Sequence, residues 1–588
     1  MDNNQSDTLH DDVSEKHSIE EQEKSHDLQQ INSKHGSMLP SEGTKKNLST
    51  FTIYLGLCVA MFMASLNSTV IAPAMGKISA ELSDLPDATW IATAYLVAFN
   101  ATQPLYGKFS DIFGRKPVIQ VGIVLFCIGS IVNACAKTMG TLIAGRTIQG
   151  LGGGGIISIV YIIIADIAPL HMRPRYQSLM MVVYGVASVF GPLVALSYRS
   201  LGGAFVDHVT WRWDFWLNVI LSVVAFALIT IFLHLPLETP SSLASKIKRI
   251  DWLGIALSIL FVVLLLLALS WGGVKYAWGS PHVIGTFVGS GISLLLLGFV
   301  EGKVAKEPLI PLPVLFNPSV AIIYTFTFMV ALGFIGAIYF GPVMFQAVYL
   351  ADSTGSGVRL LPYMMCMIGA SIGGGYLIPI VKRVKPFLVL GACFNVLGYG
   401  LFYSLNPQSN YSAQAGFLGF AGLGFGFTMQ NTVVAVQNAT EKKFMAVATS
   451  LNTFFMTLAS TVGIAIYQTV MNVLLAKQLP SVDPAALQAA QAVNAIEDYT
   501  QIVNISTQYR SAIINLYNVC LHNVFLISIV TAAIALIVSL FINNARFGAP
   551  PAVKQVETET QQVEPQGEPQ AEVVTDEEKG LESHEVEH

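Results

Sequence analysis

The chain has 588 residues, of which 53% are hydrophobic and only 12% are charged, and its formal net charge is -5. A soluble domain carries roughly 25% charged residues, so this composition excludes a soluble globular protein and indicates an integral membrane protein. The six cysteines lie in or beside apolar segments without metal-ligand or disulfide spacing, so we expect neither a metal site nor a disulfide framework.

Both ends of the chain differ from its apolar middle. Residues 1–50 are rich in Asp, Glu, Lys, His, Ser and Gln without an early apolar core, and residues 549–588 are acidic. Neither end has enough apolar side chains to bury a core, and the first has no signal-peptide pattern. We expect both ends to be disordered cytoplasmic tails.

Between the tails lie fourteen apolar segments, most of them near the roughly 20 residues that a helix needs to cross a bilayer. An even number of crossings places both tails on one side of the membrane. The segments are Phe51–Met75, Trp90–Tyr106, Val118–Ala136, Leu142–Ile164, Tyr176–Leu196, Phe215–Leu235, Trp252–Ser270, Val283–Val300, Val320–Gln346, Val358–Ile380, Pro386–Leu405, Ala413–Val436, Ala446–Leu475 and Val524–Ile542.

The distribution of basic residues indicates which side the tails occupy. Lys and Arg are concentrated in the connections on the side of the tails, as at Lys108, Arg173, Lys246 and Lys382, and are fewer on the other side. Cytoplasmic loops of membrane proteins carry this excess. We therefore expect both termini in the cytoplasm and a long outer loop at residues 476–521.

A short charged segment, Gly107–Ile119, joins the second and third apolar segments. It reads Gly-Lys-Phe-Ser-Asp-Ile-Phe-Gly-Arg-Lys-Pro-Val-Ile. Gly107 and Gly114 permit close approach of a neighbouring backbone. Asp111 and Arg115 are four residues apart, so a helical turn would bring their side chains face to face.

The pattern Gly-x-x-x-Asp-x-x-Gly-Arg-Lys-Pro resembles the signature loop of the major facilitator superfamily. A lone Arg-Lys pair would fit an ordinary basic loop, but the full pattern between two spans favours the family. The resemblance implies transport by alternating access. It also implies a gating role for five residues of this loop, Gly107, Asp111, Gly114, Arg115 and Lys116.

A second copy of this pattern supports a build of two bundles. Gly375–Pro386 echoes Gly107–Pro117 with one extra residue. Parallel halves of six spans are the plan of the superfamily, and the two spans left over resemble its fourteen-span drug:proton antiporter branch. We expect an all-α membrane protein with six-helix bundles at 51–236 and 319–548 and two extra helices within 237–318.

The fourth apolar segment contains a charge. Leu142–Gly155 places Arg146 and Gln149 one turn apart in an otherwise apolar span. A charge at membrane depth is costly unless it faces a partner or a cavity, although Arg146 could instead extend to the interface. The pattern Arg-x-x-Gln-Gly-x-Gly resembles the family's fourth-span motif, which implies proton coupling. Gly150 and Gly152–Gly155 indicate close helix packing.

Proton coupling also needs a group that titrates, because arginine stays charged. Asp166 at the end of the fourth span and Asp111 are candidates, and a structural ion pair is an equal alternative for both. The first span has Asn67 where the family branch usually has Asp, and asparagine does not titrate. We expect Asn67 either to contact substrate or to make a hydrogen bond between helices.

The fifth span resembles the antiporter motif Gly-x-x-x-Gly-Pro-x-x-Gly-Gly, which implies exchange transport. Ala187 replaces the first glycine, and residues 195–201 separate the Gly-Pro pair from the last two glycines. Either an adaptation or a gene-model error accounts for these seven residues, which as helix would add about 10 Å. The motif positions are Ala187, Gly191, Pro192, Gly202 and Gly203.

Several polar side chains in or near the spans are candidates for a substrate cavity. Hydrogen bonds between helices are the more common use of such residues. Because few charges accompany them, we expect a neutral, largely apolar cavity suited to amphipathic cargo. The candidates are Asn67, Tyr339, Gln346, Gln430 and Asn431.

These features predict a secondary transporter that exports hydrophobic or amphipathic small molecules in exchange for protons. The sequence has no nucleotide-binding, nucleophile–base or metal-ligating pattern, so we expect no cofactor, no enzymatic activity and no nucleic-acid partner. The expected partners are a small-molecule substrate, protons and the lipid bilayer, with the chain a monomer.

Three alternatives stay open at this point. Transport of amino acids into a vacuole and transport of a ferric siderophore use the same scaffold. A nutrient sensor would keep the fold without transporting, and the asparagine in the first span gives that idea some support. The plasma membrane is the expected location, with the vacuolar membrane as the alternative.

Overall fold

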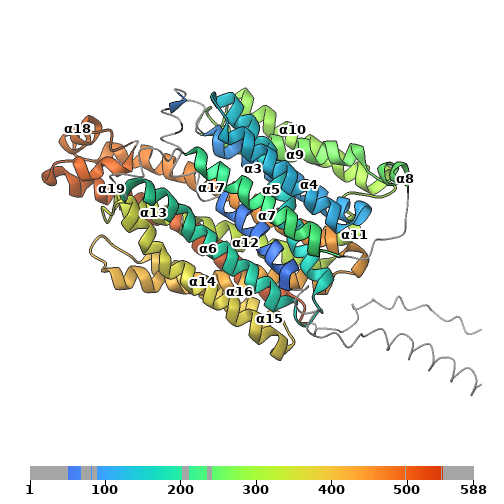
Figure 1. Ribbon diagram of the computed structural model, residues 1–588. Helices are drawn as coiled ribbons and strands as arrows, with labels where there is room; N and C mark the ends of the chain where they lie inside the picture. Colours follow the sequence, from blue (N-terminus) through green and yellow to red (C-terminus); the bar gives the residue numbers. More distant parts are fainter. Residues whose placement is uncertain are drawn as a thin grey trace, which may run out of the picture. The chain divides into compact units, whose positions relative to one another are not determined.

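The computed structural model describes residues 51–67, 78, 81–82, 89–200, 211–234, 242–273, 275–496, 498–544 and 546. For residues 189–200, 243, 353 and 354 it describes the backbone alone. Within these residues the regular structure is helical, apart from one isolated bridge between Gly272 and Tyr276. The expectation of an all-α protein is therefore confirmed (Figure 1).

Long helices follow one another along the first part of the chain (Figure 1). The helix Phe51–Asn67 comes first. It is followed by α3 (Trp90–Phe113), α4 (Arg115–Ala134), α5 (Met139–Ile167), α6 (Arg173–Ser200) and α7 (Arg212–Phe232).

The middle of the chain forms a hairpin of two helices, which lie side by side in Figure 1. The short helix α8 (Leu243–Lys248) precedes it. The hairpin consists of α9 (Trp252–Trp271) and α10 (Pro281–Phe299), and α10 ends in a π-helical turn, η2 (Val300–Val304). We call α9, α10 and η2 the central hairpin.

The second part of the chain again consists of long helices with short ones between them. In chain order these are α11 (Leu312–Leu315), α12 (Pro318–Ile335), η3 (Gly336–Phe340), α13 (Gly341–Ala347), α14 (Ser353–Val381), α15 (Lys385–Tyr403), α16 (Tyr411–Ala439), η4 (Lys442–Phe444), α17 (Met445–Gln478), η5 (Leu479–Ser481), α18 (Pro484–Ala492), η6 (Tyr499–Asn504) and α19 (Thr507–Phe541).

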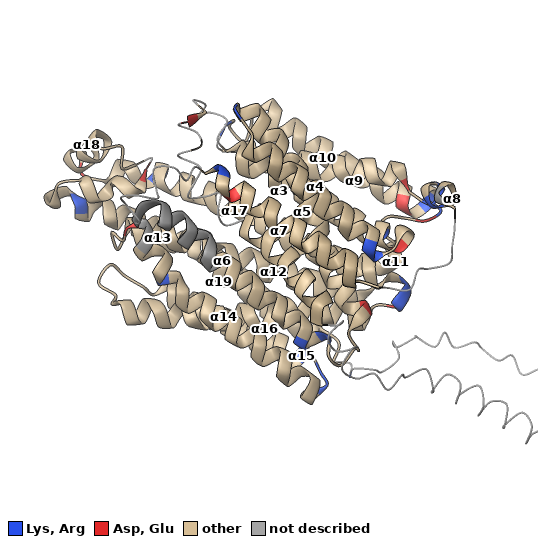
Figure 2. Cartoon of the chain, in the orientation of Figure 1, with Lys and Arg blue, Asp and Glu red and all other residues tan. Residues whose placement is uncertain are grey.

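Ten of the helices in the described part are long and apolar enough to cross a membrane. Each of the fourteen predicted segments overlaps a helix, while the exact number of crossings stays a prediction. Charged residues lie mostly near helix ends, for example around α8 and α11, and few lie in the middle of the helices (Figure 2). This distribution suits helices that cross an apolar layer.

Helix α5 is the most enclosed of the apolar helices, with 89% of its most apolar window buried. Its glycines allow the close packing that the sequence predicts. A Cβ atom on Gly150 would come within 2.5 Å of the Tyr95 carbonyl oxygen of α3, and one on Gly152 would overlap the Gly122 backbone of α4. Because glycine has no side chain, the backbones of α3 and α4 can pack directly on α5.

Two large apolar cores hold the helices together. One runs from Tyr54 to Leu233 and includes Val433 and Ala446 from the second part of the chain. The other draws almost wholly on the second part and includes Met181 of α6. Both cores thus cross between the two parts, which pack against each other through α3 and α17 and through α6 and α14.

The charged segment between α3 and α4 is more helical than the loop we predicted. Helix α3 continues to Phe113 and α4 begins at Arg115, so only Gly114 interrupts the helices. Its φ of 92° lies in the region that favours glycine. In the second copy of the pattern, Lys382 takes the corresponding turn with a φ of 58°.

The segment predicted as an outer loop at residues 476–521 contains more helix than hydropathy indicates, and its position outside the membrane stays a prediction. Helix α17 reaches Gln478, and α19 already begins at Thr507. The first turns of α19 contain polar residues that lower their hydropathy, but they are anchored by the buried side chains of Ile513, Leu516 and Tyr517. Tertiary packing thus extends the helix where hydropathy gives no signal.

Candidate functional site

The first candidate site is built around Arg146, which α5 places inside the helix bundle with 2% of its surface exposed. Its Nε donates to the Ile91 carbonyl oxygen at 2.9 Å. One terminal nitrogen donates at 2.8 Å both to Asn67 Oδ1 and to Gln149 Oε1. The guanidinium also lies 4.4 Å from the centre of the Tyr95 ring. These contacts hold the Arg146 side chain inside the helix bundle, close to the start of α3.

Two polar side chains of α4 hold Gln149 in place. Its Nε2 donates to Ser130 Oγ at 2.8 Å, and Asn133 Nδ2 donates to Gln149 Oε1 at 3.0 Å. Both residues come from α4, so side chains of α4 and of α5 itself fix this amide. Among the described residues, every hydrogen-bond partner of Arg146 is neutral. The site therefore contains a buried positive charge that is held by neutral dipoles and has no anionic partner among the described residues, which is a costly arrangement.

Sequence reasoning found part of this site. Gln149 was expected one turn from Arg146, and Asn67 was expected to contact substrate or to make a hydrogen bond between helices; the structure places both against Arg146. Ile91 and Tyr95 were missed. Ile91 contributes only a backbone carbonyl, and Tyr95 contributes a ring face from another helix. Neither contribution leaves a pattern in the sequence.

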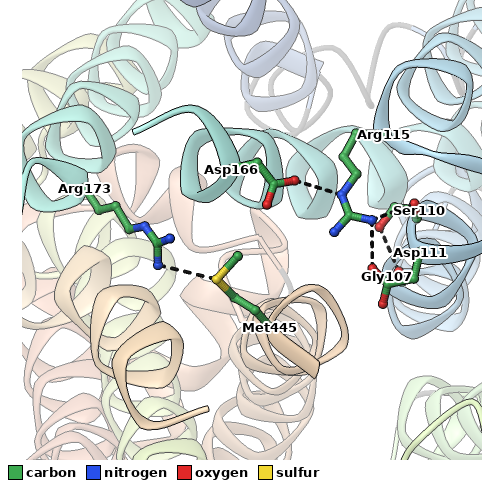
Figure 3. Close-up of polar contacts among 7 residues, drawn as sticks. All are labelled: Gly107, Ser110, Asp111, Arg115, Asp166, Arg173 and Met445. Atoms are coloured by element: carbon green, nitrogen blue, oxygen red, sulfur yellow. Dashed lines mark hydrogen bonds and ion pairs between the residues drawn. The ribbon is translucent and has the colours of Figure 1, made fainter. Parts of the chain in front are cut away.

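The second candidate site is an ion cluster centred on Arg115 at the start of α4 (Figure 3). Arg115 binds Asp111 of α3 and Asp166 of α5, each at 2.8 Å. It also donates to the Ser110 carbonyl oxygen at 2.8 Å. The Arg115 side chain is only 16% exposed, so these charge-assisted bonds are less screened than surface pairs. One guanidinium thus joins the ends of three helices.

Contacts with α7 and with the second part of the chain surround this cluster. A Cβ atom on Gly107 would lie 2.5 Å from Ser450 Oγ of α17. Arg173 at the start of α6 reaches Met445 Sδ of α17 at 3.4 Å (Figure 3). Lys116 donates to the Thr230 carbonyl oxygen of α7 at 2.8 Å. The predicted gating residues thus lie beside the contact between the two parts.

The structure separates two residues that we had grouped for proton coupling. Arg146 and Asp166 lie on the same helix, and a rise of about 1.5 Å per residue puts about 30 Å between them. Asp166 pairs with Arg115 instead. The contacts of Asp166 are therefore those of a structural ion pair, and Asp166 belongs to the cluster at the other end of α5.

The five candidates for a substrate cavity lie on several different helices. Gln430 donates to the Tyr161 hydroxyl at 3.0 Å, and Asn431 donates to the carbonyl oxygen one turn earlier at 2.7 Å. Gln346 donates to Ser356 Oγ at 3.1 Å, and Tyr339 is 48% exposed. Most of these groups make local or interhelical hydrogen bonds, as membrane helices commonly do. Their role in a substrate cavity stays a prediction.

An apolar groove does occur in the first part of the chain. It has a volume of about 240 Å³ and lies between the first helix, α6 and α7. Among the described residues its lining is apolar, so it suits apolar groups. The lining residues are Cys58, Val59, Phe62, Val182, Val183, Val186 and Leu221.

The antiporter motif lies on and after α6. Ala187 is buried against Leu66 of the first helix. The backbone of Gly191 and Pro192 is helical, and residues 195–200 continue α6 as helix. Gly202 and Gly203 lie outside the described residues. The extra residues thus lengthen the helix up to Ser200.

Together, the long apolar helices, a buried cation with neutral partners and an ion cluster at the contact of two helix groups define a multi-pass membrane carrier. The family model of the Major Facilitator Superfamily matches residues 57–464. The chain belongs to this family. It is a transporter and not an enzyme.

Fungal relatives carry names that refer to efflux. The aspyridones efflux protein of Neocamarosporium betae is 29% identical over 503 residues, which cover 84% of this chain and 87% of the relative. The MFS-type efflux pump MFS1 of Trichophyton rubrum is 31% identical, with 84% and 91% covered. The structure of the proton:xylose symporter XylE has a TM-score of 0.54 at 13% identity, with 84% and 96% covered. It shares the fold.

Proposed function

We propose that this transporter exports hydrophobic or amphipathic small molecules in exchange for protons. We place it in the plasma membrane as a monomer with both termini in the cytoplasm. The observation that carries the proposal is the full burial of Arg146 among neutral partners. A buried charge in a membrane-spanning segment is costly, and such charges commonly mark the path of an ion or a substrate.

Arg146 supports proton coupling through electrostatics. A buried cation disfavours the protonation of a neighbouring acid and repels other cations. If the distance between Arg146 and a protonatable group changes as the carrier alternates, proton binding becomes easy in one state and difficult in the other. This is the elementary requirement for coupling a proton gradient to movement of the protein.

The Arg115 cluster supports the alternation itself. Contacts such as Arg173 with Met445, and Gln177 with Gln437 at 3.0 Å, connect the two parts of the chain near this cluster. We assign the cluster to the state in which the cytoplasmic ends of the helices are held together. Breaking and remaking these contacts would then open and close the cytoplasmic side.

The apolar groove and the fungal relatives named for efflux support the class of cargo. The groove offers the first part of the chain an apolar surface without charges, which favours molecules that partition into the bilayer. Two relatives carry names that refer to efflux. Neither name assigns a cargo to this chain.

A growth screen tests the direction of transport and identifies cargo. A deletion strain and an overexpressing strain are grown with a panel of toxic amphipathic compounds while the tagged protein is imaged in the same cells. Export from the cell predicts that deletion sensitises and overexpression protects against some compounds, with the tag at the plasma membrane. Overexpression that sensitises cells and raises intracellular compound would contradict export.

A further inference from the structure

The central hairpin contains a buried acid at the end of α10. Glu301 lies in the π-helical turn η2 and is 6% exposed. Asp251 caps the start of α9 on the same side of the hairpin, with its Oδ1 accepting from the Gly254 amide at 2.9 Å. Neither residue takes part in the Arg146 site or the Arg115 cluster.

The two carboxyl groups are neighbours. A Cβ atom on Gly254 would overlap the Asp251 carboxyl group and lie 3.1 Å from Glu301 Oε1. Both groups therefore fill the space beside Gly254 that a side chain would occupy. Glu301 Oε1 also accepts from the Ile310 amide at 3.2 Å, which fixes the position of this carboxyl group.

One oxygen of each carboxyl group has no donor. Asp251 Oδ2 and Glu301 Oε2 are buried and accept no hydrogen bond from the described residues. A buried carboxylate oxygen without a donor is costly. Two adjacent carboxylates add mutual repulsion, which is relieved when they share one proton.

The cations around the pair are already engaged. Glu307 binds Lys108 at 3.2 Å and Arg249 at 2.8 Å, and the hydrogen bond from Arg249 holds the pKa of Glu307 below its usual range. Lys108 also interacts with the Glu301 carboxyl group. Lys303 and Lys306 of the same segment are exposed. Three carboxyl groups thus face two cations, and one proton makes the group neutral.

We propose that Asp251 and Glu301 form a binding site for one exchangeable proton, held between the two helices of the central hairpin. Loss of this proton leaves two adjacent negative charges beside Lys108, which belongs to α3 three residues before Asp111. The electrostatic attraction of Asp251 and Glu301 for Lys108 then competes with the ion pair between Lys108 and Glu307. The site thereby transmits its protonation to the predicted gating segment.

The link between this site and transport rests on the proposed proton-driven export, whereas the presence of the bound proton does not.

Infrared spectroscopy of the purified full-length protein in lipid nanodiscs detects a protonated carboxyl group directly. We expect its carbonyl band at neutral pH in the parent protein and its loss in Glu301→Gln. Asp251→Asn keeps the helix cap, because asparagine caps as well as aspartate, and should weaken the band by removing the neighbouring charge.

Asp352→Asn is the matched control. Asp352 caps α14 in the same way, with Oδ1 accepting from the Gly355 amide at 2.8 Å, but it is exposed. We expect the control to leave the band unchanged. A parent protein without the band, or a band that persists equally in Glu301→Gln and Asp251→Asn, would overturn the proton site.

Transport by the same variants separates the site from the export proposal. Glu301→Gln should still exchange labelled cargo for unlabelled cargo across vesicles but lose the pH dependence of efflux. Parent efflux that ignores a pH gradient while the infrared band is present would contradict proton-driven export and leave the proton site standing. Unchanged pH dependence in Glu301→Gln would remove the link between this site and transport.

Discussion

At the scale of single residues, the account depends on the shape of the Arg146 side chain. Its Nε and one terminal nitrogen donate in different directions, to a backbone carbonyl and to two side-chain amides. A lysine ammonium is a single point with a different hydration and cannot reproduce this fork. The residue type, and not only its charge, is therefore what the site requires.

Arg146→Lys should fold and reach the membrane but lose most transport, by about tenfold or more, and Arg146→Ala should lose it entirely. The lysine keeps a charge but leaves acceptors of the buried site unpaired, a cost of about 1–3 kcal/mol for each. Efflux from vesicles, normalised to the amount of protein, measures the effect. Efflux by the lysine variant close to that of the parent would exclude the coupling role of Arg146.

Sequence patterns predicted the members of this site that belong to a recognisable motif. Gln149 is one turn from Arg146, and Asn67 lies in a segment whose motif resembles that of the family branch, so both could be expected. Tyr95 and Ile91 contribute a ring face and a carbonyl group. Any aromatic residue or any backbone can supply these, so only the packing of α3 on α5 selects them.

At the scale of elements, helix α5 connects the two candidate sites. Its first half holds Arg146 and its last turn holds Asp166, and between them the glycines bring α3 and α4 into backbone contact. The glycine run predicted this packing. The extension of α19 could not be predicted in the same way, because its first turns are stabilised by contacts distant in sequence.

Gly152→Ala should destabilise the protein by about 1–3 kcal/mol, because the added methyl group has no space against α4. Gly140→Ala in the same helix is the control, since no atom lies within 4 Å of its Cβ position. There alanine should be neutral or stabilise by up to about 1 kcal/mol. Thermal unfolding in detergent compares the two. Equal melting temperatures would show that α4 and α5 do not require this close contact.

Asp111→Asn should lower turnover several-fold while leaving cargo binding within about twofold. The change removes one of the two carboxylates that hold Arg115, which shifts the balance between access states without touching the cargo. Binding and efflux are measured on the same membranes. Glu441→Gln, which breaks an exposed ion pair with Lys443, should change neither. Weakened binding with normal turnover would contradict a gating role for Asp111.

At the scale of the whole molecule, hydropathy and the paired motifs were enough to predict an all-helical carrier of this family. They could not predict which side chains meet across its two parts. Gln430 was expected in a substrate cavity and instead bonds Tyr161 of α5, while Ser158 pairs with Thr453 at 3.1 Å. Contacts of this kind depend on the relative position of two helix groups, and no local pattern encodes that position.

Proton-driven export is the central claim, and efflux from loaded vesicles tests it most directly. Vesicles that contain the full-length protein and a labelled amphipathic cargo are followed under an imposed pH gradient, with a protonophore or with ATP depletion at a clamped gradient. We predict that the protonophore abolishes efflux and that ATP depletion has no effect. Efflux that survives collapse of the pH gradient would contradict the account.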